Sequence, residues 1–167
     1  TEQLTKGNPD GDVWRPVEVD VSMRPGWFFH PTEQSKTGTE LFDIWLASVG
    51  RGAGLNLNLT PNRRGLIPDG DVLELMNLGA LIQRFTGIDL APAAEVTVEG
   101  GPQEAGALVD GQEDTCWVAE TDEPALTFRF PGAERIRGIQ VSEAIQFGQR
   151  VSSFSIDVER WGGWHEW

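Results

Sequence analysis

The chain reads TELFDIWLASVGRGAGLNLNL from residue 39 to residue 59, and this stretch joins two different periodicities. Apolar side chains recur at helical spacing over residues 39–49, with Thr37 and Glu40 in the register of a capping box. Residues 55–59 alternate strictly between leucine and asparagine, which is the period of a strand with one apolar face. We therefore predict a buried helix followed by a strand.

Similar patterns flank this stretch on both sides. A short strand is predicted where Val17, Val19 and Val21 alternate with polar residues. A second helix is predicted over residues 71–86, which carry their apolar side chains on one face, with Gly87 at the end. Alternating strands and helices build parallel sheets, which need more strands than this part supplies to cover their faces and edges. This part is therefore expected to belong to a larger sheet.

The pattern changes near residue 91, where we place a domain boundary. Short alternating apolar runs follow, separated by glycine-containing turn signals, and they indicate an antiparallel β-sandwich of about five strands. The residues of these runs are Val96, Val98, Leu126, Phe128, Phe130, Ile136, Ile139, Val141, Val151, Phe154, Ile156 and Val158. The predicted fold class is α/β plus all-β, with one domain over residues 1–91 and an incomplete sandwich over residues 92–167.

The composition excludes several kinds of partner. With 26 acidic against 13 basic residues and a net charge of −13, the surface repels polyanions, so neither nucleic acid nor an anionic membrane is expected to bind. No apolar run of about 18 residues occurs and the first residues are rich in charge, so neither a spanning helix nor a leader peptide is expected. The single cysteine, Cys116, excludes an internal disulfide and a thiolate zinc site. Seven tryptophans favour a deep core or a sugar site.

Three sequence blocks carry a resemblance to a known family. They are WRPVEVDVSMRPGWFFH at residues 14–30, SVGRGAGLNLN at residues 48–58 and PNRRGLIP at residues 61–68. Together they resemble the last strands and helices of the (β/α)₈-type barrel in bacterial α-L-fucosidases of glycoside hydrolase family 29. Residues 93–167 are similar to the start of the discoidin-like sandwich that follows that barrel. The residues that carry this second similarity are Asp110, Gly111, Thr115, Trp117, Gly148, Gln149, Arg150, Val151 and Phe154.

The resemblance implies retaining hydrolysis of terminal α-L-fucose from fucosylated glycans. It implies an Asp nucleophile and a Glu acid, about 5–5.5 Å apart as in other retaining enzymes, and no cofactor. The family's Trp-Phe-Asp-Gly-like strand end is absent here, so both carboxylates are expected on a barrel segment before Thr1. Because such a barrel takes roughly 250 residues, a companion polypeptide or a missing N-terminal segment is expected to complete it, and this chain is expected to be inactive alone.

Four residues in or near the Arg-Pro-Gly-Trp loop are candidates for substrate binding: Trp27, Arg24, Glu18 and His30. Trp27 is expected to stack on the apolar face of fucose, the alternative being a core residue that anchors its loop. Arg24 either binds a sugar hydroxyl or, in the interpretation we prefer, pairs with Glu18 or Asp20. His30 either reaches a hydroxyl or is an ordinary polar loop residue.

The two predicted strands each carry polar residues on one face. Glu18 and Asp20 have the spacing that places both carboxylates on the same side of a strand. Glu18 is thus this chain's own candidate for acid–base catalysis, although pairing with an arginine such as Arg15 is the preferred interpretation. Asn58 lies nearer than Asn56 to the strand end where barrels hold their active sites, but the preferred interpretation of both residues is a buried polar layer hydrogen-bonded to neighbouring strands.

Other features leave the specificity open. Phe29 stands where the family commonly has Tyr, which removes a hydroxyl that could reach a ligand. Asp110, Glu113 and Asp114 are potential oxygen ligands for Ca²⁺, but a solvated acidic loop is the preferred interpretation, and no metal site is expected. The alternative function is a lectin-like module that binds carbohydrate without hydrolysing it.

Overall fold

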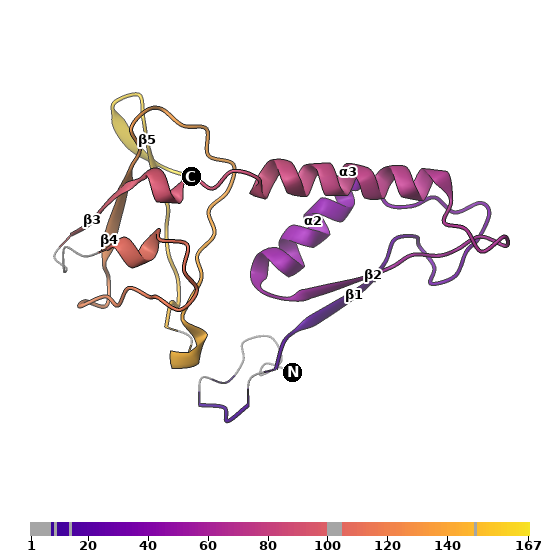
Figure 1. The fold of residues 1–167 in the computed structure, drawn as a ribbon, viewed down its shortest axis with the longest axis horizontal. Coiled ribbons are helices and arrows are strands. Elements are labelled where there is room, and N and C mark those ends of the chain that lie inside the picture. The colour runs from indigo at the N-terminus through magenta and orange to yellow at the C-terminus, as the bar shows by residue number, and fades with distance from the viewer. Residues whose placement is uncertain (1–7, 9, 14, 100–104, 149) are drawn as a thin grey trace.

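The computed structural model describes residues 8, 10–13, 15–99, 105–148 and 150–167. Its helices and strands are, in chain order, β1 (Glu18–Ser22), α2 (Gly38–Ser48), β2 (Gly54–Asn58), α3 (Asp69–Thr86), β3 (Glu95–Glu99), β4 (Ala125–Arg129), β5 (Asp157–Arg160) and β6 (Gly163–Glu166). The predicted succession of strand, helix, strand and helix is thereby confirmed. Figure 1 shows these first four elements on one side and the remaining strands on the other, joined by the chain that leaves α3.

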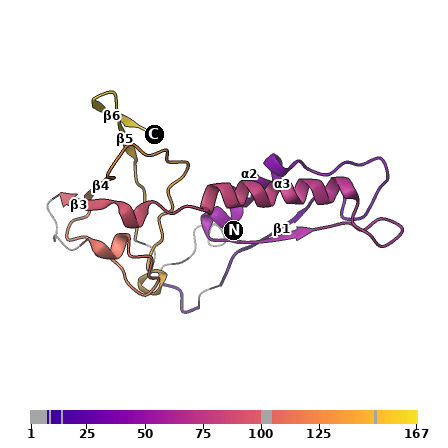
Figure 2. The same ribbon diagram turned by 45° about the horizontal axis from the view of Figure 1, so that its top comes forward.

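Strands β1 and β2 pair in parallel, and α2 is the crossover between them. Their register runs from Glu18 opposite Gly54 to Ser22 opposite Asn58, so the carboxyl ends of both strands lie side by side. Glu18 is exposed whereas Val19 is half-buried, which confirms the predicted two-faced strand. Figure 2 shows the helices lying along one face of this small sheet.

The core lies between the two helices and the apolar face of the sheet. Met23, Leu41 and Leu78 form its buried centre, at 0%, 1% and 9% exposure. The half-buried side chains packed around them are Phe42, Trp45, Leu57, Leu59, Leu75 and Ile82. The helices approach closely where α2 begins, since a Cβ on Gly38 would lie 2.5 Å from the Cβ of Asn77. Only glycine therefore fits at this crossing.

The start of α2 is closed by the predicted capping box. The Thr37 hydroxyl accepts a hydrogen bond from the backbone N–H of Glu40 at 3.3 Å, and the Glu40 carboxylate accepts one from the backbone N–H of Thr37 at 2.8 Å. The Thr37 hydroxyl also donates to the same carboxylate, at 2.8 Å. These bonds, the one from the Thr37 backbone first, hold the pKa of Glu40 below its ordinary value.

Replacing Thr37 by alanine is expected to lower the free energy of unfolding by about 1 kcal/mol at neutral pH, because the helix loses its cap. A lowered pKa in the folded state means that Glu40 stabilises the fold above its ordinary pKa of 4.5 and that this contribution is lost as the pH falls through the folded-state pKa. The difference in the free energy of unfolding between Thr37→Ala and the parent should therefore be smaller in acid. Urea unfolding at neutral pH and near pH 3 measures it. Thr39→Ala is the control, because Thr39 is exposed in the first turn. An equal loss of unfolding free energy in both variants would contradict the role of Thr37 as the helix cap.

The second half of the chain forms antiparallel pairs. Strand β3 pairs with β4 and β5 with β6, each as a two-stranded sheet, and within the described residues these pairs do not join into a sandwich. The strand predicted at Ile136, Ile139 and Val141 is wrong, because this stretch is not a strand in the structure. Of the run predicted from Val151 to Val158, only its end is confirmed, since Val158 lies in β5. Alternation creates a strand only where a neighbouring strand accepts the backbone hydrogen bonds.

Strands β5 and β6 form a hairpin with a two-residue turn of Trp161 and Gly162. Both residues have positive φ, 52° and 79°, as a type I′ turn requires. Trp161 is 91% exposed, and its ring lies at 74° to the His165 ring with a centroid distance of 5.7 Å. The turn therefore presents an aromatic ring to solvent.

Candidate functional site

A closed loop connects β1 to α2 at the carboxyl ends of both parallel strands. We call residues 23–36 the Trp27 loop. The backbone N–H of Met23 donates to the carbonyl of Asn58 at 3.1 Å, and the N–H of Lys36 donates to the carbonyl of Met23 at 2.8 Å. The Lys36 ammonium also donates to the carbonyl of Ser22, at 2.7 Å. The two ends of the loop are thus fixed together at the strand ends, where parallel sheets hold their functional sites.

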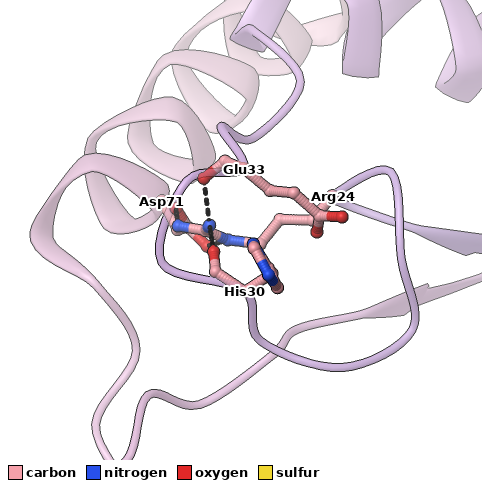
Figure 3. A network of polar contacts seen from close by, with 4 residues as sticks. All are labelled: Arg24, His30, Glu33 and Asp71. Carbon is pink, nitrogen blue, oxygen red and sulfur yellow. Dashed lines mark hydrogen bonds and ion pairs between the residues drawn. The ribbon is translucent and has the colours of Figure 1, made fainter.

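Arg24 belongs to the Trp27 loop, but it is buried, with only 6% exposure. Its Nε and Nη2 donate to the two carboxylate oxygens of Asp71 at 2.8 and 2.7 Å, and its Nη1 donates to the carbonyls of Glu33 and His30 (Figure 3). The ring of Phe29 lies 5.1 Å from the guanidinium carbon. The hydrogen bond to Asp71, the largest cause, raises the pKa of Arg24. Arg24 therefore ties the Trp27 loop to the first turn of α3.

The predicted partner of Arg24 was wrong. The sequence favoured Glu18 or Asp20, but the structure gives Asp71, which is 2% exposed and 47 residues away in the chain. Both predicted carboxylates lie on the exposed face of β1, whereas the Arg24 side chain is buried. Asp71 was missed because an acidic residue in the first turn of a helix is explained by the helix dipole alone.

The end of each strand also holds the loop. Asn58 Nδ2 donates to Ser22 Oγ at 3.2 Å and to the carbonyl of Trp27 at 3.1 Å, and Ser22 Oγ donates to the carbonyl of Gly26 at 2.7 Å. The predicted bond to a neighbouring strand is confirmed for Asn58 by the first of these contacts, whereas Asn56 is exposed and is not part of a buried polar layer. The side chains of Trp27 and Phe28 are nevertheless 51% and 86% exposed. The loop is therefore fixed through its backbone while the side chains of Trp27 and Phe28 stay exposed.

The structure brings three of the four candidate binding residues into this loop. His30 is exposed, and its Nδ1 lies 2.9 Å from the Thr32 hydroxyl. Glu18 is different: it begins β1, opposite Gly54, whereas the Trp27 loop follows the other end of that strand. The strand therefore separates Glu18 from Trp27 by its own length.

Glu33 is a loop residue that sequence reasoning missed. A Cβ on Gly26 would lie 3.4 Å from Glu33 Oε2, so the carboxylate sits against the turn that precedes Trp27. Its Oε2 is buried and has no hydrogen-bond partner among the residues that the structure describes. No spacing or motif in the sequence singles this residue out.

The third sequence block forms a second loop at the same end of the sheet. Asn62 organises it, because its Oδ1 accepts hydrogen bonds from the backbone N–H groups of Arg64 at 2.9 Å and Leu66 at 3.2 Å. Gly65 completes the turn with a φ of 77°. Figure 1 shows this loop and the Trp27 loop together, at the end of the sheet away from β3 and β4. The three blocks thus meet around the carboxyl ends of β1 and β2.

The acidic loop near Asp110 uses its carboxylate internally. Asp110 accepts hydrogen bonds from the backbone N–H of Gln112 at 2.9 Å and from the hydroxyl of Thr115 at 2.8 Å, and these bonds lower the pKa of Asp110. Within the described ranges, no group of three His, Cys, Asp or Glu side chains is arranged to hold a metal ion. No described helix is long and apolar enough to cross a bilayer.

The fold of this chain is similar to solved structures of glycoside hydrolase family 29, whereas no protein-family model matches the chain. The crystal structure of SpGH29 superimposes with a TM-score of 0.83 at 32% identity, over 98% of this chain and 37% of that chain. A Ruminococcus gnavus family 29 fucosidase in complex with fucose gives a TM-score of 0.57 at 30% identity, over 66% of this chain and 24% of its own.

Curated relatives agree with these structures. Alpha-L-fucosidase 1 of Arabidopsis thaliana is 33% identical over 97% of this chain and 33% of its own length. A second plant relative, from Oryza sativa subsp. japonica, is 37% identical over 91% of this chain and 31% of its own. The chain thus spans about a third of the length of the curated relatives that it matches. The similarity includes plant and bacterial proteins, so it does not single out a bacterial source.

Proposed function

We propose that this chain forms part of a retaining exo-α-L-fucosidase of glycoside hydrolase family 29, which removes terminal α-L-fucose from glycans. The observation that carries the proposal is the exposed Trp27, held at the carboxyl ends of two parallel strands in a chain similar to SpGH29 over 98% of its length. A tryptophan face offers the flat apolar surface that a sugar ring stacks on. In this proposal the Trp27 loop is one wall of the fucose pocket.

The same proposal assigns β1 and β2 to a (β/α)₈-type barrel, over residues 1–91, and residues 92–167 to a discoidin-like sandwich. Two-stranded parallel sheets have two free edges, and further strands of the barrel would pair there. The chain spans only about a third of its curated relatives, so we place the catalytic Asp and Glu in the remainder of the protein or in a companion polypeptide. Glu18 remains this chain's own candidate for acid–base catalysis.

Within the pocket, the candidate residues take different roles. Trp27 stacks on the sugar, and His30, which is exposed on the same loop, reaches a sugar hydroxyl. Arg24 holds the loop in place and does not bind the sugar itself, because Asp71 and two loop carbonyls already accept its hydrogen bonds. Glu18 binds or protonates the substrate only if the complete barrel brings substrate to its end of β1.

The test is turnover of an aryl α-L-fucoside by the isolated chain and by the assembled protein. The assembled protein is expected to hydrolyse the fucoside and to release the α-anomer first, as retention requires. The isolated 167 residues are expected to show no turnover, because the nucleophile lies elsewhere. An aryl β-galactoside serves as the control. Turnover by the isolated chain would contradict the placement of the nucleophile.

The alternative function is a lectin-like module, and one observation favours it. Three tryptophans near the β5–β6 hairpin are exposed: Trp161 at 91%, Trp164 at 61% and Trp167 at 48%. Exposed indole rings are typical sugar platforms. Fucose binding without turnover in every assembly would support this function over hydrolysis.

A further inference from the structure

One side chain reaches across the sheet to hold the segment that presents Trp27. Asn58 ends β2, and its Nδ2 donates both to Ser22 Oγ, at the end of β1, and to the carbonyl of Trp27, at 3.2 and 3.1 Å. A side-chain amide nitrogen carries two N–H donors, so both donors of Asn58 are used. Asn58 thus joins the two strand ends and the loop at a single point.

Ser22 links the Asn58 contact to a second carbonyl of the loop, that of Gly26. Asn58 donates to the Ser22 hydroxyl, and that hydroxyl in turn donates to the carbonyl of Gly26 at 2.7 Å. Ser22 is only 7% exposed, so water competes little for these bonds. Two consecutive carbonyls, those of Gly26 and Trp27, are therefore fixed while the Trp27 ring stays half exposed.

The other supports of the loop act elsewhere. Arg24 holds the carbonyls of His30 and Glu33, and Lys36 closes the base of the loop. Among the hydrogen bonds of the described residues, those of Asn58 and Ser22 are the ones that hold the carbonyls of Trp27 and Gly26. Without Asn58 the carbonyl of Trp27 would lose its hydrogen bond, and Ser22 alone would hold the turn through Gly26, while the bonds of Arg24 and Lys36 would keep the rest of the loop in place.

We propose that Asn58 is the positioning residue of the sugar pocket: it fixes Trp27 in the stacking position before the ligand arrives. This inference rests on the proposed function of Trp27. A loop that is already ordered does not lose conformational entropy on binding, and ordering one free residue weakens binding by about tenfold. Loss of Asn58 therefore raises KM for a fucoside and leaves kcat nearly unchanged.

The first experiment measures kinetics in the assembled protein with an aryl α-L-fucoside. Asn58→Ala is expected to raise KM about tenfold while kcat changes less than about twofold. Asn58→Asp keeps the shape of the side chain but has no N–H donor, and it should behave in the same way. Asn56→Ala is the matched control, because Asn56 lies on the same strand with an exposed side chain, and its KM should not change. An equal effect in the control, or a loss confined to kcat, would overturn the inference.

The second experiment measures backbone ¹⁵N order parameters in the chain itself, without ligand. Asn58 and Ser22 hold the carbonyls of Trp27 and Gly26, so Asn58→Ala should lower the order parameters of residues 26–28 from about 0.85 to below about 0.6. The order parameter of Glu33, whose N–H donates to the carbonyl of His30, should not change. Unchanged order parameters at residues 26–28 would show that Asn58 does not anchor Trp27, whatever the kinetics show. Lower order parameters with an unchanged KM would overturn the positioning role. A parent protein that never turns over fucosides would instead refute the proposed function, and the order parameters would still decide whether Asn58 anchors Trp27.

Discussion

Asp71→Ala is expected to lower the free energy of unfolding by about 3–5 kcal/mol. The substitution leaves the Arg24 guanidinium, which is 6% exposed, without the carboxylate that neutralises it. It also removes two charge-assisted hydrogen bonds, of 2.8 and 2.7 Å, that tie the Trp27 loop to α3. Removing one partner of a buried pair costs far more than an exposed pair is worth, because the remaining charge stays desolvated. Urea unfolding followed by tryptophan fluorescence measures the loss.

The chain offers a matched control for this variant. Asp69 lies two residues earlier in the first turn of α3, and its side chain is exposed. Asp69→Ala removes only a favourable interaction with the helix dipole, so a loss of about 1 kcal/mol or less is expected. The double variant Arg24→Met, Asp71→Leu should recover most of the stability, since it leaves no charge buried. If Asp71→Ala were as mild as Asp69→Ala, the ion pair would not be what holds the loop to the helix.

The first half of the fold was predictable because its signals are local. The capping box needs only Thr37 and Glu40, three residues apart, and the helical and strand periods each repeat within a few residues. The partner of Arg24 was not predictable, because no pattern links two residues 47 positions apart. Sequence reasoning therefore chose Glu18 and Asp20, which are near Arg24 in the chain, as its partners. In the structure both carboxylates lie on the exposed face of β1, away from the buried Arg24 side chain.

The second half shows what alternation alone leaves undecided. Val96 and Val98 are two residues apart, and so are Ile139 and Val141, yet the first pair lies in a strand and the second does not. The difference is the partner: β3 has β4 beside it in antiparallel register. A strand is stable only with such a neighbour, and a single sequence does not state which stretches become neighbours.

The candidate site was predictable in part. The resemblance pointed to the Trp27 loop. The contact between Asn58 and Ser22 that helps to hold this loop, however, depends on the parallel register that sets the two residues opposite each other. Given that register, two polar residues at adjacent strand ends are expected to bond to each other. The contact of Asn58 with the carbonyl of Trp27 also depends on how the loop folds back, which no local pattern in the chain determines.

Trp27→Ala is expected to lower kcat/KM of the assembled protein for an aryl α-L-fucoside by about 30-fold. The indole ring is already 51% exposed and its backbone is held on both sides, so little must change when a sugar covers it. Burying one face of such a ring against a sugar contributes about 2 kcal/mol, and each 1.4 kcal/mol is about tenfold in affinity. The effect should appear in KM, and Trp27→Phe, which keeps a smaller flat face, should lose less. Trp164→Ala, on the β5–β6 hairpin, is the control of equal size and similar exposure. A loss of fucoside affinity in Trp164→Ala with none in Trp27→Ala would move the sugar site to the hairpin, because the two rings belong to different elements and a ligand stacked on one leaves the other free.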